Sequence, residues 1–219
     1  MKVLIIAGGK LSDRFLKEMY EYYKADHVIV ADGALAAMDR MQLPFHSLVG
    51  DFDTIAPEIL KKYENQWNLY VERHVPEKNE TDSELAIRIA VEKHPTDIMI
   101  LGAMGGRMDH TLGNIHLMRQ CLEREIPCAI YDEWNRITLV KKEAVLKKNE
   151  TYGKYVSFLP LFEYAENVTL KGFRYPLVNA LLQKGTTLAI SNEVAEETAS
   201  VSVENGILIC IESKDEGKE

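Results

Sequence analysis

The sequence predicts two domains of different type: an N-terminal α/β domain and a C-terminal antiparallel β-sandwich. In the first half, short apolar runs alternate with helical patterns, which is typical of a doubly wound, mainly parallel sheet with helices on both faces. After about Trp134 the hydrophobic period falls to near two, which is typical of antiparallel strands. A chain of 219 residues with 46% hydrophobic residues is long enough for one or two cores. We place the domains at 1–135 and 136–219, with a linker in the polar segment Glu133–Asn149.

Each element of the first half is predicted from its hydrophobic pattern. The first helix repeats apolar residues at helical spacing through Phe15, Leu16 and Met19, and the last repeats them through Leu112, Ile115 and Met118. The expected strands are Val3–Ala7, His27–Ala31, Ser47–Val49, Asn68–Val71, Asp97–Leu101 and Pro127–Tyr131. The expected helices are Leu11–Lys24, Ala34–Met41, Thr81–Lys93 and Met108–Arg124.

The second half contains short alternating runs separated by turn residues. The expected strands are Val168–Leu170, Thr186–Ser191, Ala199–Val203 and Ile207–Ile211. Asn205-Gly206 lies between the last two, and because both residues tolerate positive φ, this pair predicts a hairpin. A small sandwich or barrel follows from this pattern.

Composition excludes several classes of function. The chain has 26 Lys+Arg against 34 Asp+Glu, a net charge of −8, which disfavours binding to nucleic acid or to an anionic membrane. Its apolar runs are too short for a signal-peptide core or a membrane span. The three cysteines are an odd number without metal-ligand spacing, so we expect free thiols and a cytoplasmic protein.

Candidate functional residues follow the predicted strands, where open α/β sheets bind their ligands. Gly8-Gly9-Lys10 has neither the P-loop nor the dinucleotide spacing, so by itself it favours a plain turn over a phosphate cradle. Asp32-Gly33, taken alone, is more typical of a helix cap. Asp51 and Asp53 either turn toward one pocket or form a solvated Asx-turn, and the pattern does not decide between these readings.

Two further segments stand at predicted helix starts. Thr81 and Glu84 form a capping box, while Asp82 falls in the first helical turn, near backbone N–H groups that also receive phosphate. The most specific segment is Leu101–His110, where three glycines precede Arg107, Asp109 and His110. The glycines permit close approach of a ligand, and the guanidinium suits phosphate. A helix cap alone does not require so many special residues.

These residues together suggest a phosphate-transfer site. Several carboxylates around one crevice repel one another unless a cation is present, and oxygen-only ligands favour Mg²⁺ over zinc. Arg107 and Lys78 suit a polyanion that bridges such metals. The residues therefore predict a Mg²⁺–nucleoside-triphosphate site and phosphoryl-type transfer without naming the acceptor. The acids concerned are Asp32, Asp51, Asp53, Asp82 and Asp109.

Four motifs, in this order, resemble those of the thiamine pyrophosphokinase family in its bacterial form. They are Ala-Asp-Gly-Ala at 31–34, Gly-Asp-Phe-Asp-Thr at 50–54, Thr-Asp-Ser-Glu-Leu-Ala at 81–86 and Gly-Ala-Met-Gly-Gly-Arg-Met-Asp-His at 102–110. Leu188–Glu193 is similar to the Ser-Asn thiamine motif of that family, so the resemblance covers nearly the whole chain.

The resemblance implies a catalytic ATP-binding domain, a thiamine-binding sandwich and a homodimer whose site is shared between subunits. It also implies transfer of the pyrophosphoryl group of ATP to the thiamine hydroxyl, with AMP as the leaving group. The family's roles fall on these residues: catalysis on Asp51, Asp53, Asp82, Arg107 and Asp109; Mg²⁺ on Asp51, Asp53 and Asp82; ATP on Asp32, Gly33, Thr81, Gly105, Gly106 and His110; thiamine on Ser191 and Asn192; and Asn114 as a weaker addition.

One departure and two alternatives accompany this resemblance. Some family members stack a tryptophan on thiamine shortly after the Ser-Asn motif, but the only tryptophans here are Trp67 and Trp134. One alternative is a pyrophosphokinase that acts on another small alcohol. The other is a non-catalytic thiamine or nucleotide sensor, although a sensor has no need of the complete acidic set.

Overall fold

The computed structural model describes residues 1–52, 55–64, 69–73 and 80–215. The chain divides into two compact units, Met1–Asp132 and the part from Glu133 onward. The sequence-based division fell nearby, between residues 135 and 136.

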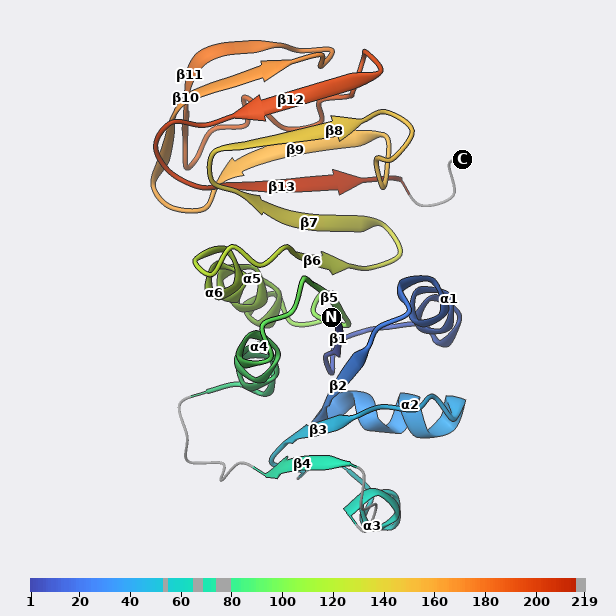
Figure 1. Ribbon diagram of the computed structural model, residues 1–219. Coiled ribbons are helices and arrows are strands. Elements are labelled where there is room, and N and C mark those ends of the chain that lie inside the picture. The colour runs from blue at the N-terminus through green and yellow to red at the C-terminus, as the bar shows by residue number, and fades with distance from the viewer. Residues whose placement is uncertain (53–54, 65–68, 74–79, 216–219) are drawn as a thin grey trace. The chain divides into compact units, whose positions relative to one another are not determined.

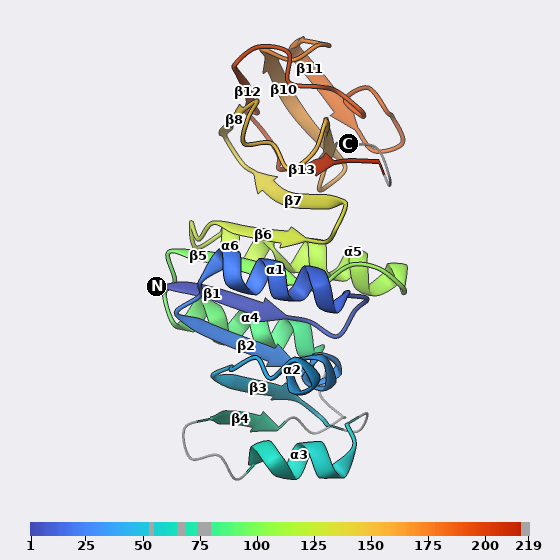
Figure 2. The ribbon, with the colours of Figure 1, turned by 90° about the vertical axis from the view of Figure 1, so that its right-hand side faces the viewer.

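The first unit is built on a parallel sheet. Its strands run in the order β4-β3-β2-β1-β5-β6, and neighbouring pairs are parallel (Figure 2). Their bounds are β1 Lys2–Ile6, β2 His27–Ala31, β3 Ser47–Gly50, β4 Tyr70–Arg73, β5 Asp97–Leu101 and β6 Cys128–Tyr131. The chain moves outward from β1 to β4 and then returns to β5 on the other side of β1. This reversal creates a crevice at the carboxyl ends of β1 and β5.

Helices cover both faces of this sheet, as predicted. Figure 1 shows α1 and α2 on one face and α4, α5 and α6 on the opposite face. The bounds are α1 Asp13–Tyr23, α2 Leu35–Met41 after a 3₁₀ turn at Asp32–Ala34, α3 Pro57–Glu64, α4 Asp82–Glu92, α5 Met108–Leu117 and α6 Arg119–Leu122. The expected helix Met108–Arg124 is therefore divided at Met118, and α3 was not foreseen.

Local sequence explains where the helices begin and which face they bury. Ser12 caps α1 by accepting a hydrogen bond from the N–H of Phe15 at 3.2 Å. Thr81 caps α4 in the same way, with its Oγ1 3.2 Å from the N of Glu84. The side-chain amide of Gln120 donates a hydrogen bond from Nε2 to Glu84 Oε1 at 3.4 Å. On the α1 face, Leu16 packs with Leu4 and other fully buried strand residues.

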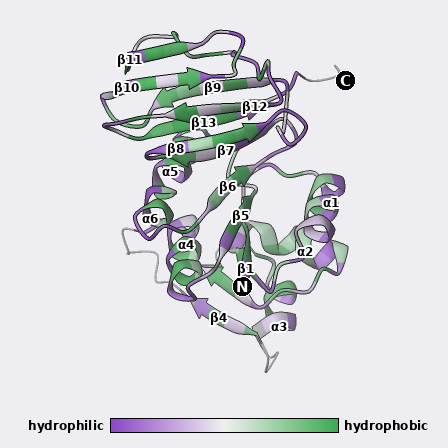
Figure 3. Ribbon diagram, turned by 45° about the horizontal axis from the view of Figure 1, so that its top comes forward, coloured by the Kyte–Doolittle hydropathy of each residue, from purple (hydrophilic) through white to green (hydrophobic). Residues whose placement is uncertain are grey.

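The second unit is a sandwich of two antiparallel sheets. One sheet has the order β7-β13-β9 and the other β11-β10-β12-β8. The bounds are β7 Asn135–Val140, β8 Glu143–Lys147, β9 Tyr155–Pro160, β10 Tyr164–Lys171, β11 Leu177–Gln183, β12 Thr198–Ser202 and β13 Leu208–Ser213. Phe158 and Cys210 of the first sheet pack with Leu170 and Val201 of the second in one buried cluster. Figure 3 shows the apolar character of these strands.

Three predictions for the second half were wrong. Glu133–Asn149 is not a linker, because it contains β7 and β8, which bury Ile137, Val140 and Leu146. Thr186–Ser191 forms turns rather than a strand. The apolar residues of this segment alternate as they would in a strand, but the backbone is not extended. Ser191 has a φ of +57°, outside the β region.

The predicted hairpin at Asn205-Gly206 was also wrong. The strands on either side of it belong to different sheets, since β12 pairs with β10 and β8 while β13 pairs with β7 and β9. Gly206 does adopt a positive φ, +101°. The turn is instead held to β10, where the N of Glu166 lies 2.8 Å from the carbonyl oxygen of Asn205. Burial of one face of each strand in the core of the sandwich outweighs local pairing across the turn.

No helix in the described part of the chain is long and apolar enough to span a membrane.

Candidate active site

A pocket of about 690 Å³ lies in the first unit, at the crevice created by the strand order. It is surrounded by the segments that follow β1, β2, β3 and β5, together with the beginning of α4 and one side of α5. This is the location at which open α/β sheets bind ligands. The lining residues are Ala7, Gly8, Gly9, Lys10, Ala31, Asp32, Gly33, Asp51, Thr81, Asp82, Ser83, Gly102, Ala103, Gly105, Gly106, Arg107, His110 and Asn114.

Two glycine-containing loops pack directly against each other beside this pocket. The N–H of Gly9 donates to the carbonyl oxygen of Gly102 at 2.7 Å. A Cβ on Gly9 would lie 2.3 Å from that oxygen, and a Cβ on Gly102 would lie 2.3 Å from the carbonyl oxygen of Ala7. Glycine is therefore required at both positions by the backbone contact itself. Part of the pocket wall is consequently main chain, which lets a ligand approach the backbone closely.

The structure brings three of the predicted acids to this pocket. Asp32, Asp51 and Asp82 all line it, and Asp32 is only 3% exposed. Gly50 allows β3 to approach Asp32, because a Cβ there would lie 2.6 Å from the Cβ of Asp32. Within the described ranges, no three His, Cys, Asp or Glu side chains are close enough to hold a metal ion together. Asp53 and Lys78 lie outside the described residues.

Arg107 and Asp109 form an exposed bidentate ion pair. Arg107 Nε lies 3.1 Å from Asp109 Oδ1, and Nη2 lies 2.5 Å from Oδ2. The N–H of His110 also donates to Oδ1 at 3.0 Å. The hydrogen bond from Arg107 is the main reason that the pKa of Asp109 is lowered to about 2. Arg107 lines the pocket, whereas Asp109 is not among the lining residues and faces Arg107.

The remaining predicted ATP-binding residues also line the pocket, and other lining residues were given less weight by the sequence. Gly33, Thr81, Gly105, Gly106 and His110 all face it. Asn114, one turn after His110 on α5, is 6% exposed and donates from Nδ2 to the carbonyl oxygen of Ala103 at 2.8 Å. It therefore holds the loop that follows β5.

Lys10 and Ser83 are pocket residues that the sequence reasoning missed as site residues. Lys10 belonged to a segment for which a plain turn was favoured over a phosphate cradle, and Ser83 was given no role of its own. The available signal was position, because Lys10 lies in the loop that follows β1 and Ser83 lies in the first turn of α4.

Ser191 and Asn192 lie in the second unit, in the connection between β11 and β12. Asn192 is only 2% exposed, and its amide is used within the protein. Its Oδ1 accepts from the N–H groups of Tyr175 at 3.0 Å and Glu193 at 2.9 Å, and its Nδ2 donates to the carbonyl oxygen of Tyr175 at 2.7 Å. Ser191 is exposed, and its N–H donates to Ser157 Oγ at 3.0 Å. Their role in binding thiamine remains a prediction.

The fold and the pocket define a two-domain protein in which a β-sandwich follows an α/β domain that has a polar ligand pocket at its switch point. Family models match both parts: thiamin pyrophosphokinase, catalytic domain, over residues 19–130, and thiamin pyrophosphokinase, vitamin B1 binding domain, over residues 143–208. The chain is also 36% identical to thiamine pyrophosphokinase of Bacillus subtilis over 216 residues, covering 96% of this chain and 98% of that protein.

Solved structures agree with these matches. The crystal structure of the Bacillus subtilis thiamine pyrophosphokinase superposes with a TM-score of 0.86 at 33% identity, covering 98% of this chain and 100% of that one. The thiamin pyrophosphokinase of Geobacillus thermodenitrificans gives a TM-score of 0.84 at 31% identity, covering 99% of each chain. The chain belongs to the thiamine pyrophosphokinase family, and both the resemblance and the fold class predicted from the sequence are confirmed.

Proposed function

We propose that this chain transfers the pyrophosphoryl group of ATP to the hydroxyl of thiamine, which yields thiamine diphosphate and AMP. The observation that carries the proposal is that both halves match, one as a catalytic domain and the other as a vitamin B1 binding domain. A pyrophosphokinase for an unrelated alcohol would not be expected to carry the second match.

We assign ATP to the pocket of the first unit. This assignment is supported by the main-chain wall around Gly9 and Gly102 and by Lys10 and Arg107, which supply positive charge beside that wall. The start of α4 adds backbone N–H groups, which attract phosphate oxygens. Thiamine is assigned to the second unit, where the exposed Ser191 is the better candidate for a direct contact and Asn192 for holding the loop.

We assign Mg²⁺ to Asp51, Asp53 and Asp82. The oxygen donors of Asp51 and Asp82 at one pocket suit this ion. Mg²⁺ usually keeps several waters and takes further ligands from nucleotide phosphates, so a few protein carboxylates are enough to hold it. When bound, Mg²⁺ supplies positive charge against the polyphosphate.

The chain's own residues contribute mainly by positioning and by neutralising charge. The thiamine oxygen forms a bond to the β-phosphorus while the bond from that phosphorus to the α-phosphate oxygen breaks, so that AMP leaves and the hydroxyl proton is released. Arg107 is placed to exchange its exposed partner Asp109 for a phosphate, because its planar fork fits either anion. Asp109 then becomes available to orient the hydroxyl.

We also propose a homodimer with a site shared between subunits. The proposal is supported by the edge strand β11, where Val178 is 74% exposed and Leu181 is 55% exposed. Tyr164 on the neighbouring β10 is 50% exposed. Apolar side chains on an exposed edge strand usually mark a contact surface. Light scattering at micromolar concentration tests this proposal, and a monomer would contradict it.

A cytoplasmic location is a further proposal. Its support is that Cys121, Cys128 and Cys210 are all free, as expected in a reducing compartment.

The deciding experiment incubates the purified protein with ATP, Mg²⁺ and thiamine, and follows AMP and thiamine diphosphate by chromatography. We expect both products in equal amounts. ADP with thiamine monophosphate would show attack at the γ-phosphorus and would contradict the mechanism. Bound thiamine without any product would favour the sensor, and product from another alcohol but not from thiamine would favour a different pyrophosphokinase.

A further inference from the structure

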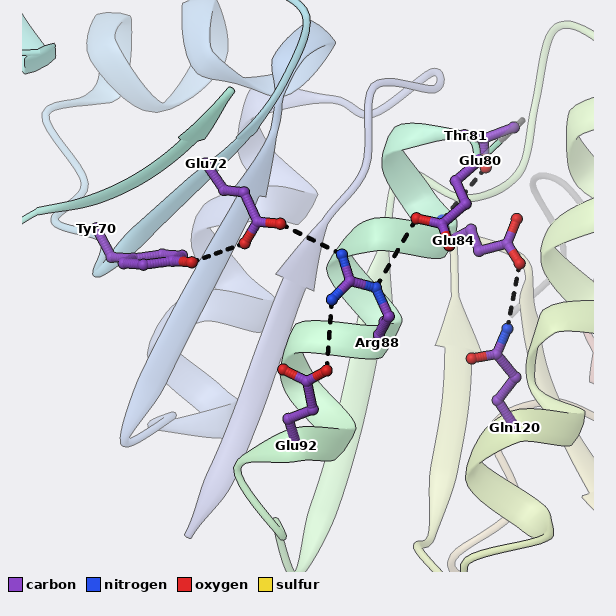
Figure 4. Close-up of polar contacts among 8 residues, drawn as sticks. All are labelled: Tyr70, Glu72, Glu80, Thr81, Glu84, Arg88, Glu92 and Gln120. Atoms are coloured by element: carbon purple, nitrogen blue, oxygen red, sulfur yellow. Dashed lines mark hydrogen bonds and ion pairs between the residues drawn. The ribbon is translucent and has the colours of Figure 1, made fainter. Parts of the chain in front are cut away.

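The start of α4 forms one wall of the pocket. Arg88, which lies further along α4 and does not line the pocket, contacts the residue just before this start. Thr81, Asp82 and Ser83 line the pocket, and Thr81 caps the helix. Glu80 directly precedes this cap. Further along α4, Arg88 extends its guanidinium back toward Glu80 (Figure 4).

Arg88 connects three carboxylates through different nitrogens. Nη2 lies 3.2 Å from Glu72 Oε1, Nε lies 3.8 Å from Glu80 Oε2, and Nη1 lies 3.4 Å from Glu92 Oε1. Figure 4 shows the guanidinium at the centre of this group. Glu92 is an ordinary i,i+4 partner on the same helix, whereas Glu72 belongs to β4 and Glu80 precedes the helix.

Glu72 is itself held from its other side. The hydroxyl of Tyr70 donates to Glu72 Oε2 at 2.7 Å, so both oxygens of this carboxylate are engaged. The arrangement runs from β4 through Arg88 to Glu80. A single cation thus links the edge strand of the parallel sheet to the residue beside Thr81 and Asp82.

Stability alone does not explain this arrangement. The side chains of Arg88 and Glu80 are each 38% exposed, and that of Glu72 is 25% exposed. Ion pairs with such exposure contribute little to folding. One guanidinium among three carboxylates also leaves an excess of negative charge. The planar guanidinium of Arg88, which reaches three carboxylates at once, instead restricts the geometry of the residues that carry them.

We propose that Arg88 is a positioning residue that holds the start of α4, and with it Thr81 and Asp82, in place against β4. The inference deepens the proposed function, since its kinetic consequence rests on Thr81 and Asp82 taking part in nucleotide binding. Arg88 itself touches neither substrate. Removing it takes away the link between Glu72 and Glu80, so that Glu80 and the cap that follows it are no longer held against β4.

The kinetic test compares Arg88→Met with Arg88→Lys. For Arg88→Met we expect the KM for ATP to rise about tenfold, with smaller changes in kcat and in the KM for thiamine, because binding of the nucleotide is weakened. Arg88→Lys should recover part of this loss, since it keeps the charge but not the fork. An equal loss for both substrates, together with a lower Tm, would overturn the positioning role.

Control variants separate this effect from a general loss of charge. Glu80→Gln should raise the KM for ATP, whereas Glu92→Gln should not, although both remove one partner of Arg88. Arg14→Met removes an exposed pair, Arg14 Nε to Glu18 Oε1 at 3.0 Å, on a different helix and should behave like the wild type. If Arg88→Met behaves like Arg14→Met, the proposal is wrong.

A second measurement needs neither activity nor ligand. The N–H groups of Glu84 and Leu85 donate to Thr81, and their amide hydrogen exchange in the free protein should be faster in Arg88→Met than in the wild type or in Arg14→Met. If the wild type forms no thiamine diphosphate, the proposed function fails, and the exchange rates still decide the role of Arg88. Unchanged rates would overturn it, and if Arg88→Met does not fold, Glu80→Gln serves for the same comparison.

Discussion

The two regions that carry family motifs use their polar residues differently. In the first unit, the motif residues Asp32, Thr81 and Arg107 face one pocket. In the second unit, the motif residue Asn192 is 2% exposed, and its side-chain amide forms hydrogen bonds with the backbone of Tyr175 and Glu193. A motif residue can therefore either contact a ligand or hold the loop that makes the contact, and the burial of its side chain distinguishes the two cases.

The largest expected effect is the loss of activity when a pocket carboxylate is neutralised. Asp51→Asn should lower kcat by about 10²–10⁴-fold, because it removes a charge assigned to the Mg²⁺–polyphosphate. The fold should persist, and the apo protein should be slightly stabilised, since one member of a repelling group of acids becomes neutral. Steady-state kinetics and thermal unfolding measure both effects. Glu18→Gln, an exposed acid on α1, is the control, and near-native turnover of Asp51→Asn would remove Asp51 from the site.

The next effect tests the scaffold role in the second unit. Asn192→Ala should reduce the free energy of unfolding by about 3 kcal/mol, because part-buried backbone groups of Tyr175 and Glu193 lose their partners. Ser191→Ala should change stability by less than about 0.5 kcal/mol and should raise the KM for thiamine more than that for ATP. Urea unfolding and kinetics of the two variants provide the comparison. If Asn192→Ala keeps native stability but loses thiamine affinity, its amide faces the ligand.

Two glycines of the first unit should respond in opposite directions to alanine. Gly102→Ala should destabilise by about 2 kcal/mol or more, because its φ of +67° and the oxygen of Ala7 at 2.3 Å leave no room for a Cβ. Gly113→Ala should stabilise by about 0.5–1 kcal/mol, since a Cβ in this helix meets nothing within 4 Å. Thermal unfolding of both variants measures the signs. Destabilisation by Gly113→Ala would mean that α5 has a closer neighbour there.

The smallest effect is a pH dependence confined to the first unit, which holds all six histidines of the chain. Burial lowers the pKa of His27 from 6.5 to about 4, with Lys93 and His46 adding to the shift. The unfolded chain therefore takes up a proton first as the pH falls. The contribution of neutral His27 to the free energy of unfolding is complete above about pH 6.5 and is lost as the pH falls toward 4. The loss is on the order of 1 kcal/mol after allowing for the partial exposure of the side chain.

Urea unfolding at pH 7 and pH 5 checks this expectation. His27→Gln should flatten the pH dependence of the first unit, whereas His116→Gln, at an exposed position of α5, should leave it unchanged. Equal pH dependence in wild type and His27→Gln would assign the effect to other groups.

Much of the first unit was predictable from the sequence. Continuous apolar runs define β2 and β5 with the bounds His27–Ala31 and Asp97–Leu101, because strands buried on both faces need no alternation. Thr81 caps α4 as its spacing to Glu84 predicts. The position of the pocket followed from strand order, and Asp51, Asp82 and Arg107 were expected there.

The second unit was predicted less well because its strands bury only one face, so their apolar residues do not form continuous runs. The pattern of β7 and β8 is weak, with few fully buried residues, so polar lysines made the segment resemble a linker. Asn205-Gly206 has the backbone freedom of a hairpin, but its flanking strands enter different sheets. Local propensity specifies a turn without specifying which strands it joins.

The sequence by itself determined the class of each half, the starts of α1, α2, α4 and α5, and the set of acids from which the site is drawn, because these depend on local spacing and composition. Only the tertiary structure decided that Asn192 faces inward, that Lys10 joins the pocket and that Arg88 links Glu72 to Glu80. Those outcomes depend on contacts between segments far apart in the chain, and the competition for such contacts is settled by packing rather than by any local pattern.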